Sequence, residues 1–177
     1  MPSLLSIRPA TPEDALALAA FAAQAFTDTY RDLDAREVAD YVAEHLQPEV
    51  MSGVIQDPAC TTLLACVGNQ LAGYAILRAG PSPACVARPA PLELWRIYLG
   101  EGFIGQGLGS RLRRAVQAEA RRQGARSLWL GVYDRNVRAV QFYKRFGFAP
   151  VGGKEFLFGG RLYIDPIYAA DLPLETT

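Results

Sequence analysis

The sequence predicts a mixed α/β (α+β) fold in which one central sheet of about seven strands is flanked by helices. Strand-like runs alternate with runs of helical periodicity along the whole chain. The proline-rich stretch 80–91 lies between two strand-like runs, so we interpret it as a loop inside one domain. A length of 177 residues suits a single domain with its own core, and we expect residues 1–177 to form one domain.

The first elements are expected to be a short strand and a helix. Leu4 to Arg8 is the strand candidate. Thr11-Pro12-Glu13-Asp14 is typical of a helix start, because threonine caps, proline fits the first turn and acidic side chains favour the positive end of the helix dipole. Apolar residues at helical spacing predict the buried face of this helix: Leu16, Ala19, Ala20, Ala23 and Phe26.

Periodicity and turn residues place the remaining elements. Gly68-Asn69-Gln70 is turn-like between two β-rich runs, and Gly124 and Gly147 are typical of helix ends. We expect helices over 35–45 and 48–55, followed by strands over 61–67, 71–78 and 92–99. A helix over 108–123, a strand over 127–133, a helix over 136–146 and strands over 148–151 and 162–169 complete the chain. The helix over 108–123 has its apolar face at Leu108, Leu112, Ala115 and Val116.

Composition narrows the class of protein. Lys and Arg number 18, as do Asp and Glu, so the formal net charge is zero and a nucleic-acid partner is disfavoured. Cys60, Cys66 and Cys85 do not suit a disulfide framework, and the single His45 gives no zinc set, so we expect no metal. No stretch reaches the ~18 apolar residues of a membrane span. The N-terminus also lacks a signal-peptide run, so we expect a soluble, cytoplasmic protein with no membrane partner.

The segment 94–110 predicts an anion-binding turn. A strand is followed by a glycine-rich turn and an amphipathic helix, and free N–H groups at a helix start bind phosphate. A P-loop would need a Lys-Ser/Thr pair after Gly107, where Leu108-Gly109 stands. A dinucleotide fingerprint would need a glycine at Ser110. Specific residues exclude both of these phosphate-binding motifs. The alternative that the turn only makes room for packing is not excluded.

A second motif lies at 128–148. A strand is followed by Asn136-x-x-Ala139, then by the pair Phe142-Tyr143, and then by Gly147-Phe148. Asn136 stands where a helix N-cap belongs. The two motifs are independent of each other, so chance alone does not readily account for both of them in this order and at this spacing.

Together the two motifs resemble those of the GNAT superfamily of N-acetyltransferases, over about residues 4–170. The coenzyme A signature of that family, Gln/Arg-x-x-Gly-x-Gly/Ala, matches 104–109 except at Ile104, where the family prefers Arg or Gln. The resemblance implies acetyl-CoA as the cosubstrate, with its pyrophosphate bound by the backbone amides of the glycine turn. It also implies a splayed pair of parallel strands, here 94–99 and 128–133, with the pantetheine arm in the gap.

The resemblance implies roles for individual residues. Ile97 and Leu99 would pair with the pantetheine arm through their backbone, and Asn136 would bind the arm. Tyr143 would give a proton to the leaving sulfur. The full set expected to bind the coenzyme is Ile97, Tyr98, Leu99, Ile104, Gly105, Gln106, Gly107, Leu108, Gly109, Ser110, Asn136, Ala139, Phe142 and Tyr143.

The attacking amine needs a base. An alkyl amine has a pKa near 10.4, so its deprotonation at pH 7 costs about 4.6 kcal/mol. Glu93, at the start of the strand that carries Ile97, is the first candidate, and a carboxylate that simply lies in solvent is its alternative. His45 and a water path are the other two candidates. A backbone N–H near 97–99 would stabilise the carbonyl oxygen as it gains charge.

Aromatic and basic side chains are assigned less specifically. Aromatic rings attract cations and would line the acceptor pocket, although core packing is an equally good account of each: Phe26, Tyr30, Tyr41, Trp95 and Tyr133. Arginines give the helix after the glycine turn a basic face, which would meet the 3′-phosphate of coenzyme A or lie in solvent: Arg111, Arg113, Arg114, Arg121 and Arg122.

Three functions stay open. The first is acetyl transfer to a small primary amine, such as a polyamine, by direct attack in a ternary complex. Glu155-Phe156 followed by Asp165 resembles the spermine/spermidine acetyltransferase branch. The second is transfer to a protein lysine or an N-terminal peptide amine. The third is a coenzyme A-binding sensor without turnover, against which Asn136 and Tyr143 argue. The sequence leaves open the acceptor and whether the chain forms a homodimer.

Overall fold

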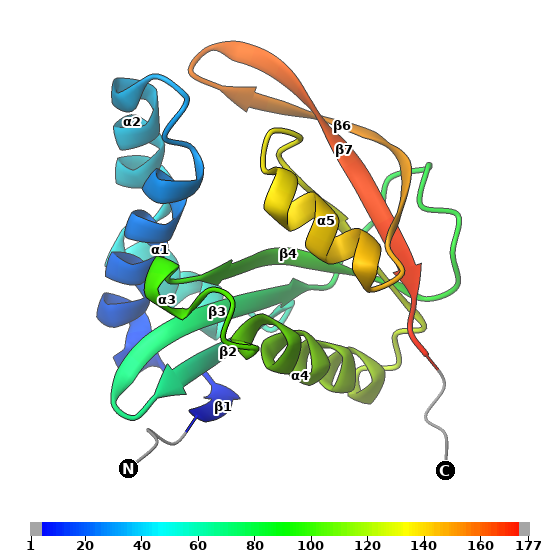
Figure 1. Cartoon of the computed structure of the whole chain (residues 1–177), viewed down its shortest axis with the longest axis horizontal. Coiled ribbons are helices and arrows are strands. Elements are labelled where there is room, and N and C mark those ends of the chain that lie inside the picture. The colour runs from blue at the N-terminus through cyan, green and yellow to red at the C-terminus, as the bar shows by residue number, and fades with distance from the viewer. Residues whose placement is uncertain (1–4, 174–177) are drawn as a thin grey trace. The chain divides into compact units, whose positions relative to one another are not determined.

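The computed structural model describes residues 5–173 and has the expected mixed architecture. Seven strands form one sheet in the order β1-β2-β3-β4-β5-β7-β6, with helices flanking it (Figure 1). The strands are β1 Leu5–Pro9, β2 Cys60–Val67, β3 Gln70–Arg78, β4 Pro91–Leu99, β5 Ser127–Gly131, β6 Ala149–Phe158 and β7 Arg161–Asp171. The helices are α1 Ala15–Thr29, α2 Ala35–His45, α3 Pro48–Gln56, α4 Leu108–Arg122 and α5 Val137–Arg145. Leu4, the expected start of the first strand, lies outside the described residues.

The chain divides into two compact units, and each is described by itself. The first holds residues up to Leu77 together with Arg96–Val116, and the second holds Arg78–Trp95 together with residues from Gln117 onward. Both β4 and α4 therefore contribute a part to each unit.

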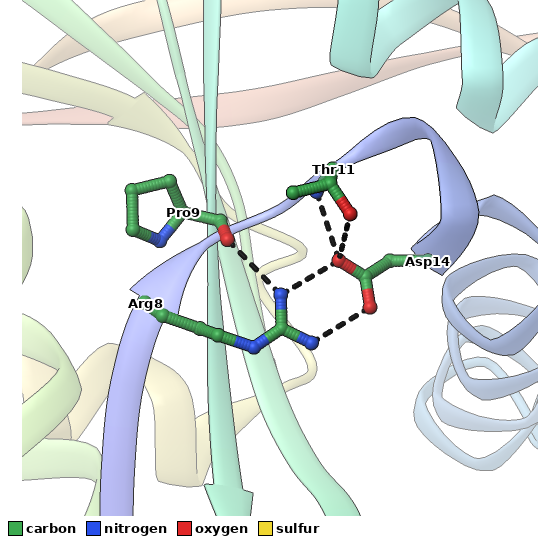
Figure 2. Close-up of polar contacts among 4 residues, drawn as sticks. All are labelled: Arg8, Pro9, Thr11 and Asp14. Atoms are coloured by element: carbon green, nitrogen blue, oxygen red, sulfur yellow. Dashed lines mark hydrogen bonds and ion pairs between the residues drawn. The ribbon is translucent and has the colours of Figure 1, made fainter.

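A network of charged hydrogen bonds holds the junction between β1 and α1. Both carboxylate oxygens of Asp14 accept hydrogen bonds from Arg8, at 2.7 Å each, and Arg8 also donates to the carbonyl of Pro9 at 3.1 Å (Figure 2). The backbone N–H of Thr11 donates to Asp14 Oδ2 at 2.8 Å. The bond from Arg8 holds the pKa of Asp14 well below its usual range. The helical run starts where the sequence predicted, with a 3-10 helix over Pro12–Asp14 that has Thr11 as its N-cap, but α1 itself begins only at Ala15, with Asp14 as its N-cap.

The buried face of α1 differs from the expected one. Leu16 is 71% exposed and Ala20 is also exposed, so the face predicted from spacing was wrong at these positions. The helix is apolar nearly all round, and its packing against α2 and α3 therefore selects the face. The buried residues are Ala15, Leu18, Ala19, Ala22, Ala25 and Phe26.

The other long helix, α4, follows its expected pattern. Leu108, Leu112 and Val116 are buried, and arginines cover much of the opposite side. Gly124, with a φ of +83°, follows the last turn, as predicted for a helix end. The charged residues of α4 show in the sequence which side of the helix faces solvent, whereas α1 has no such charged side.

The second unit contains a longer hairpin than the sequence analysis predicted. β6 runs to Phe158 and β7 begins at Arg161, so the expected ends at 151 and 162 were wrong. Gly159 and Gly160 both have positive φ, of +55° and +72°, as a two-residue type I′ turn requires. The two strands pair antiparallel up to the turn, where Phe158 stands opposite Arg161.

β5 is shorter than expected. It ends at Gly131 rather than at Tyr133. The N–H of Val132 still donates to the carbonyl of Pro166 at 3.1 Å, but the carbonyl of Tyr133 accepts from the N–H of Asn136 at 2.9 Å. The backbone at Tyr133 has therefore already turned toward α5.

Candidate active site

The glycine turn between β4 and α4 has the backbone of an anion-binding loop. Gly105 and Gly107 have φ of +82° and +79°, and a Cβ added at either would meet no atom within 4 Å. α4 begins at Leu108, so the N–H groups of its first turn need acceptors from outside the helix. The Gln106 side chain donates to the carbonyl of Gly102 at 2.7 Å and is thereby held against the loop. These features fit a pyrophosphate group. The predicted residues on this turn are consecutive: Ile104, Gly105, Gln106, Gly107, Leu108, Gly109 and Ser110.

The end of β4 that leads into this turn lies close to the backbone of β3. A Cβ at Gly73 would lie 2.7 Å from Leu99 Cδ2 and 2.9 Å from the carbonyl oxygen of Tyr98, so only glycine fits there. The ring of Tyr98 stacks on Tyr74, with 5.7 Å between centroids. These contacts fix the strand end that carries the predicted backbone groups of Ile97 and Leu99.

A buried arginine, Arg96, stands in the same half of β4 and was not singled out from the sequence. It is 8% exposed, and its Nη2 donates to the hydroxyl of Tyr41 at 3.2 Å. Burial opposes its charge, but electrostatic interactions with Tyr74, Tyr41 and Tyr98 outweigh burial and raise the pKa of Arg96. A charged residue inside the apolar run of a strand is the signal that could have marked it.

Three of the aromatic residues expected at the acceptor pocket form one stack in the first unit. The ring of Phe26 lies 4.3 Å from that of Tyr30 and 4.4 Å from that of Tyr41, measured between centroids. Tyr41 in turn lies 4.4 Å from His45, which is part-exposed and 3.7 Å from Glu44. Phe26 is nearly inaccessible to solvent, so its ring packs in the core of this unit.

In the second unit, Glu93 is a buried carboxylate with a cationic partner. It is 8% exposed, which excludes the alternative of a carboxylate in solvent. The parallel pairing of β4 with β5 covers residues 91–93 and 127–129, so Glu93 is the last residue of β4 that pairs with β5, opposite Trp129. Nε of Arg78, the last residue of β3, donates to Glu93 Oε2 at 2.8 Å. A buried charge is tolerated when it is paired in this way.

The ring of Trp95 makes a cation–π contact with an arginine of the same unit. The guanidinium carbon of Arg78 lies 3.9 Å from the centroid of the Trp95 ring. Glu93 and Trp95 are two residues apart on β4, so their side chains project to the same face of the strand. Arg78 therefore contacts both side chains at once. The sequence predicted neither contact.

α5 positions the residues of the second motif. The side-chain oxygen of Asn136 accepts a hydrogen bond from the N–H of Ala139 at 3.2 Å, which confirms the predicted N-cap. Tyr143 is buried, with its ring packed edge-on against Phe142 and Phe148 at centroid distances of 5.7 and 5.6 Å. Ala139 and Phe142 are half-buried on the same helix. The N-cap leaves the amide Nδ2 of Asn136 as the group that can donate outside the helix.

β7 carries a carboxylate whose ionisation is opposed by its surroundings. Burial and the like charge of Asp134 raise the pKa of Asp165 to about 6, although the cation of Lys154 acts in the opposite direction. Lys154 stands opposite Asp165 in the β6–β7 hairpin. Its Nζ also lies 5.9 Å from the centroid of the Trp129 ring.

Within residues 5–173, no group of three His, Cys, Asp or Glu side chains is placed to hold a metal ion. In the same range, every helix is too short or too polar to cross a bilayer.

Comparison with known proteins shows the family. The model of the acetyltransferase (GNAT) family matches residues 18–148. An uncharacterised N-acetyltransferase of Mycobacterium tuberculosis is 32% identical over 160 residues, which cover 90% of this chain and 98% of that protein. The spermine/spermidine N(1)-acetyltransferase of Bacillus subtilis is 31% identical over 62 residues, 34% of this chain and 41% of that protein.

The fold is shared with solved structures. The PaiA N-acetyltransferase of Thermoplasma acidophilum, in complex with coenzyme A, has a TM-score of 0.79 and 20% identity, and the match covers 95% of this chain and 99% of that one. The family model spans the glycine turn and the whole of the second motif, which are the segments that the sequence analysis singled out. The chain therefore belongs to the GNAT family and is an acetyl-CoA-dependent N-acetyltransferase.

Proposed function

We propose that the chain transfers the acetyl group of acetyl-CoA to a primary amine of a small molecule, such as a polyamine, by direct attack in a ternary complex. The observation that carries the proposal is the backbone of the glycine turn. Gly105 and Gly107 adopt left-handed conformations directly before the first turn of α4, and open space lies over both. Unbonded N–H groups at the positive end of a helix favour a pyrophosphate.

The remaining coenzyme contacts follow from the same proposal. The backbone of Ile97 and Leu99 would bond the pantetheine arm, and the amide Nδ2 of Asn136 would donate to it. Ile104 is a half-buried apolar residue where the family prefers Arg or Gln, so binding of the pyrophosphate rests on backbone amides here. We also propose that the whole chain works as one acetyltransferase domain, because the family model spans residues of both units.

The proposed chemistry requires an ammonium group to become an amide. The ammonium gives one proton to Glu93, directly or through a water molecule, and its lone pair then forms the N–C bond to the acetyl carbon. A backbone N–H at 97–99 would stabilise the carbonyl oxygen as it gains charge. The C–S bond breaks, the sulfur takes a proton from Tyr143, and the second proton lost by nitrogen restores the tyrosine. One proton in total passes to solvent.

The choice of a small amine as acceptor is supported by the relatives. The partial match to the spermine/spermidine acetyltransferase covers 34% of this chain. The buried Glu93 would provide a base for an amine that is charged at neutral pH. A cytoplasmic location is proposed because none of Cys60, Cys66 and Cys85 forms a disulfide within the described residues.

Thermal unfolding with and without acetyl-CoA tests the coenzyme site. At a hundredfold excess over Kd, a ligand stabilises the native state by about 2.7 kcal/mol. Gly107→Glu should abolish this shift, because it places bulk and negative charge where the pyrophosphate binds. Gly124→Glu is the matched control: Gly124 has a φ of +83° and open space, as Gly107 does, but it lies at the other end of α4. If folded Gly107→Glu protein binds acetyl-CoA normally, the proposed site is wrong.

An amine panel tests the acceptor. Thiol release from acetyl-CoA is measured with spermidine, with lysine-containing peptides and with peptides that have a free N-terminus. We expect the highest kcat/KM with a small amine. Preference for a peptide would favour the second function, and a lack of thiol release with every small amine of the panel would refute the proposed acceptor.

A further inference from the structure

Arg78 holds the Glu93 carboxylate at a single point. Its Nε donates to Oε2 at 2.8 Å, so the hydrogen bond leaves the second oxygen, Oε1, outside this contact. The Glu93 side chain is only 10% exposed, whereas that of Arg78 is 33% exposed. The carboxylate is thus buried and fixed through one oxygen by a guanidinium that reaches it from the end of the neighbouring strand.

The guanidinium is itself held in place by Trp95. Its central carbon lies 3.9 Å from the ring centroid, within the range of a cation–π interaction. Trp95 and Glu93 project to the same face of β4, so ring and carboxylate position the guanidinium from two sides. A lysine at position 78 would keep the positive charge but would lose the planar group that stacks on the ring and directs the Nε–H.

We propose that Arg78 is a positioning residue for acetyl transfer: held by the Trp95 ring, it fixes Oε2 of Glu93 and so orients Oε1 toward the amine or its bridging water. This inference rests on the proposed role of Glu93 as the base. A base contributes only when its oxygen lies within hydrogen-bond reach of the proton that it removes. A displacement of about 1 Å in such a group can cost about 10²-fold in rate.

A purely structural role for Arg78 is the alternative, because removing one partner of a buried ion pair destabilises a protein. The two roles differ in the effect of an Arg78 substitution when Glu93 has already been replaced by the neutral glutamine. If Arg78 acts by positioning Glu93, its substitution has no further effect on kcat in a Glu93→Gln background. If its role is independent, the losses in kcat caused by the two substitutions add as activation free energies.

The test measures kcat with spermidine, or with the best amine of the panel, for Arg78→Gln, Arg78→Lys, Glu93→Gln and the double variant Arg78→Gln/Glu93→Gln. We expect Arg78→Gln to lower kcat by about 10- to 100-fold. The thermal shift with acetyl-CoA should stay unchanged, and the loss should shrink at high pH, as we also expect for Glu93→Gln. The double variant should match Glu93→Gln alone. Arg78→Lys should recover the unfolding temperature but not kcat.

Arg88→Gln is the matched control, since Arg88 is also a part-buried arginine paired with a carboxylate in the second unit, at 2.9 Å from Asp171. It should keep the wild-type kcat. Additive losses in the double variant, or full recovery of kcat by Arg78→Lys, would overturn the positioning role while leaving Glu93 as the base. Wild-type activity of Glu93→Gln would instead overturn the base, and with it the role of Arg78. If Arg78→Gln does not fold, Arg78→Lys decides between the two roles.

Discussion

Replacing Asp165 by asparagine should stabilise the protein above about pH 6 and have little effect below about pH 4. In the folded chain, burial and then the charge of Asp134 raise the pKa of Asp165 from 3.8 to about 6. A shift of about two units corresponds to about 3 kcal/mol of difference between the two protonation states. Asp165 is only half-buried, so solvent screening reduces the effect to about 1–1.5 kcal/mol.

The sign follows from proton binding. Because the pKa of Asp165 is raised on folding, the folded chain binds the proton more tightly than the unfolded chain. The resulting stabilisation is fully present below the unfolded pKa and is lost as pH rises through about 6. Above that pH the carboxylate is charged in both states, and the folded chain bears the cost of burial and repulsion. An asparagine at this position cannot ionise and escapes this cost.

Urea unfolding between about pH 4 and pH 8 measures the effect as a difference in free energy of unfolding. The wild type and Asp165→Asn should converge at low pH, and the variant should be more stable by about 1–1.5 kcal/mol at high pH. Asp40→Asn, at an exposed position of α2, is the control. A difference that does not change with pH, or a variant that is less stable near pH 8, would refute the reasoning.

Three other substitutions test the site and the fold. Glu93→Gln should lower kcat/KM mainly below about pH 8.5, where the amine is charged, and a loss of equal size at every pH would remove Glu93 as the base. Tyr143→Phe keeps the ring between Phe142 and Phe148. It should lower kcat by about 10²-fold or somewhat less, with acetyl-CoA affinity within a few fold; an unchanged kcat would make Tyr143 a packing residue. Asp14→Asn removes the charged partner of Arg8 and should lower the free energy of unfolding by about 1 kcal/mol at neutral pH. Because Arg8 holds the pKa of Asp14 well below its usual range, this loss should begin to shrink below about pH 4 and keep shrinking as pH falls further, and a loss that does not change with pH would contradict it.

The segments predicted best from the sequence are those whose signals are local. Asn136 is the N-cap of α5, as its position before the helical run predicted. The buried face of α4 follows from the separation of its leucines from its arginines. The glycine turn could be recognised because left-handed backbone conformations favour glycine, and it directly precedes a helix start, where N–H groups favour a phosphate group.

Only the tertiary structure decided features that depend on residues far apart in the sequence. α1 is apolar on nearly every side, so its neighbours, rather than its periodicity, determined that Leu16 faces solvent. The β6–β7 hairpin is held by cross-strand pairing that extends past Gly152 and Gly153, which weaken a strand when it is considered alone.

The surroundings of Glu93 show the same division. Its sequence position marked it as a candidate base, but its burial and its pairing with Arg78, fifteen residues earlier, could not be predicted. That contact exists because the end of β3 lies beside β4 in the sheet, and strand order and register are set by the burial of whole strand faces. Local propensity determines which residues form an element, whereas the packing of elements determines which side chains meet.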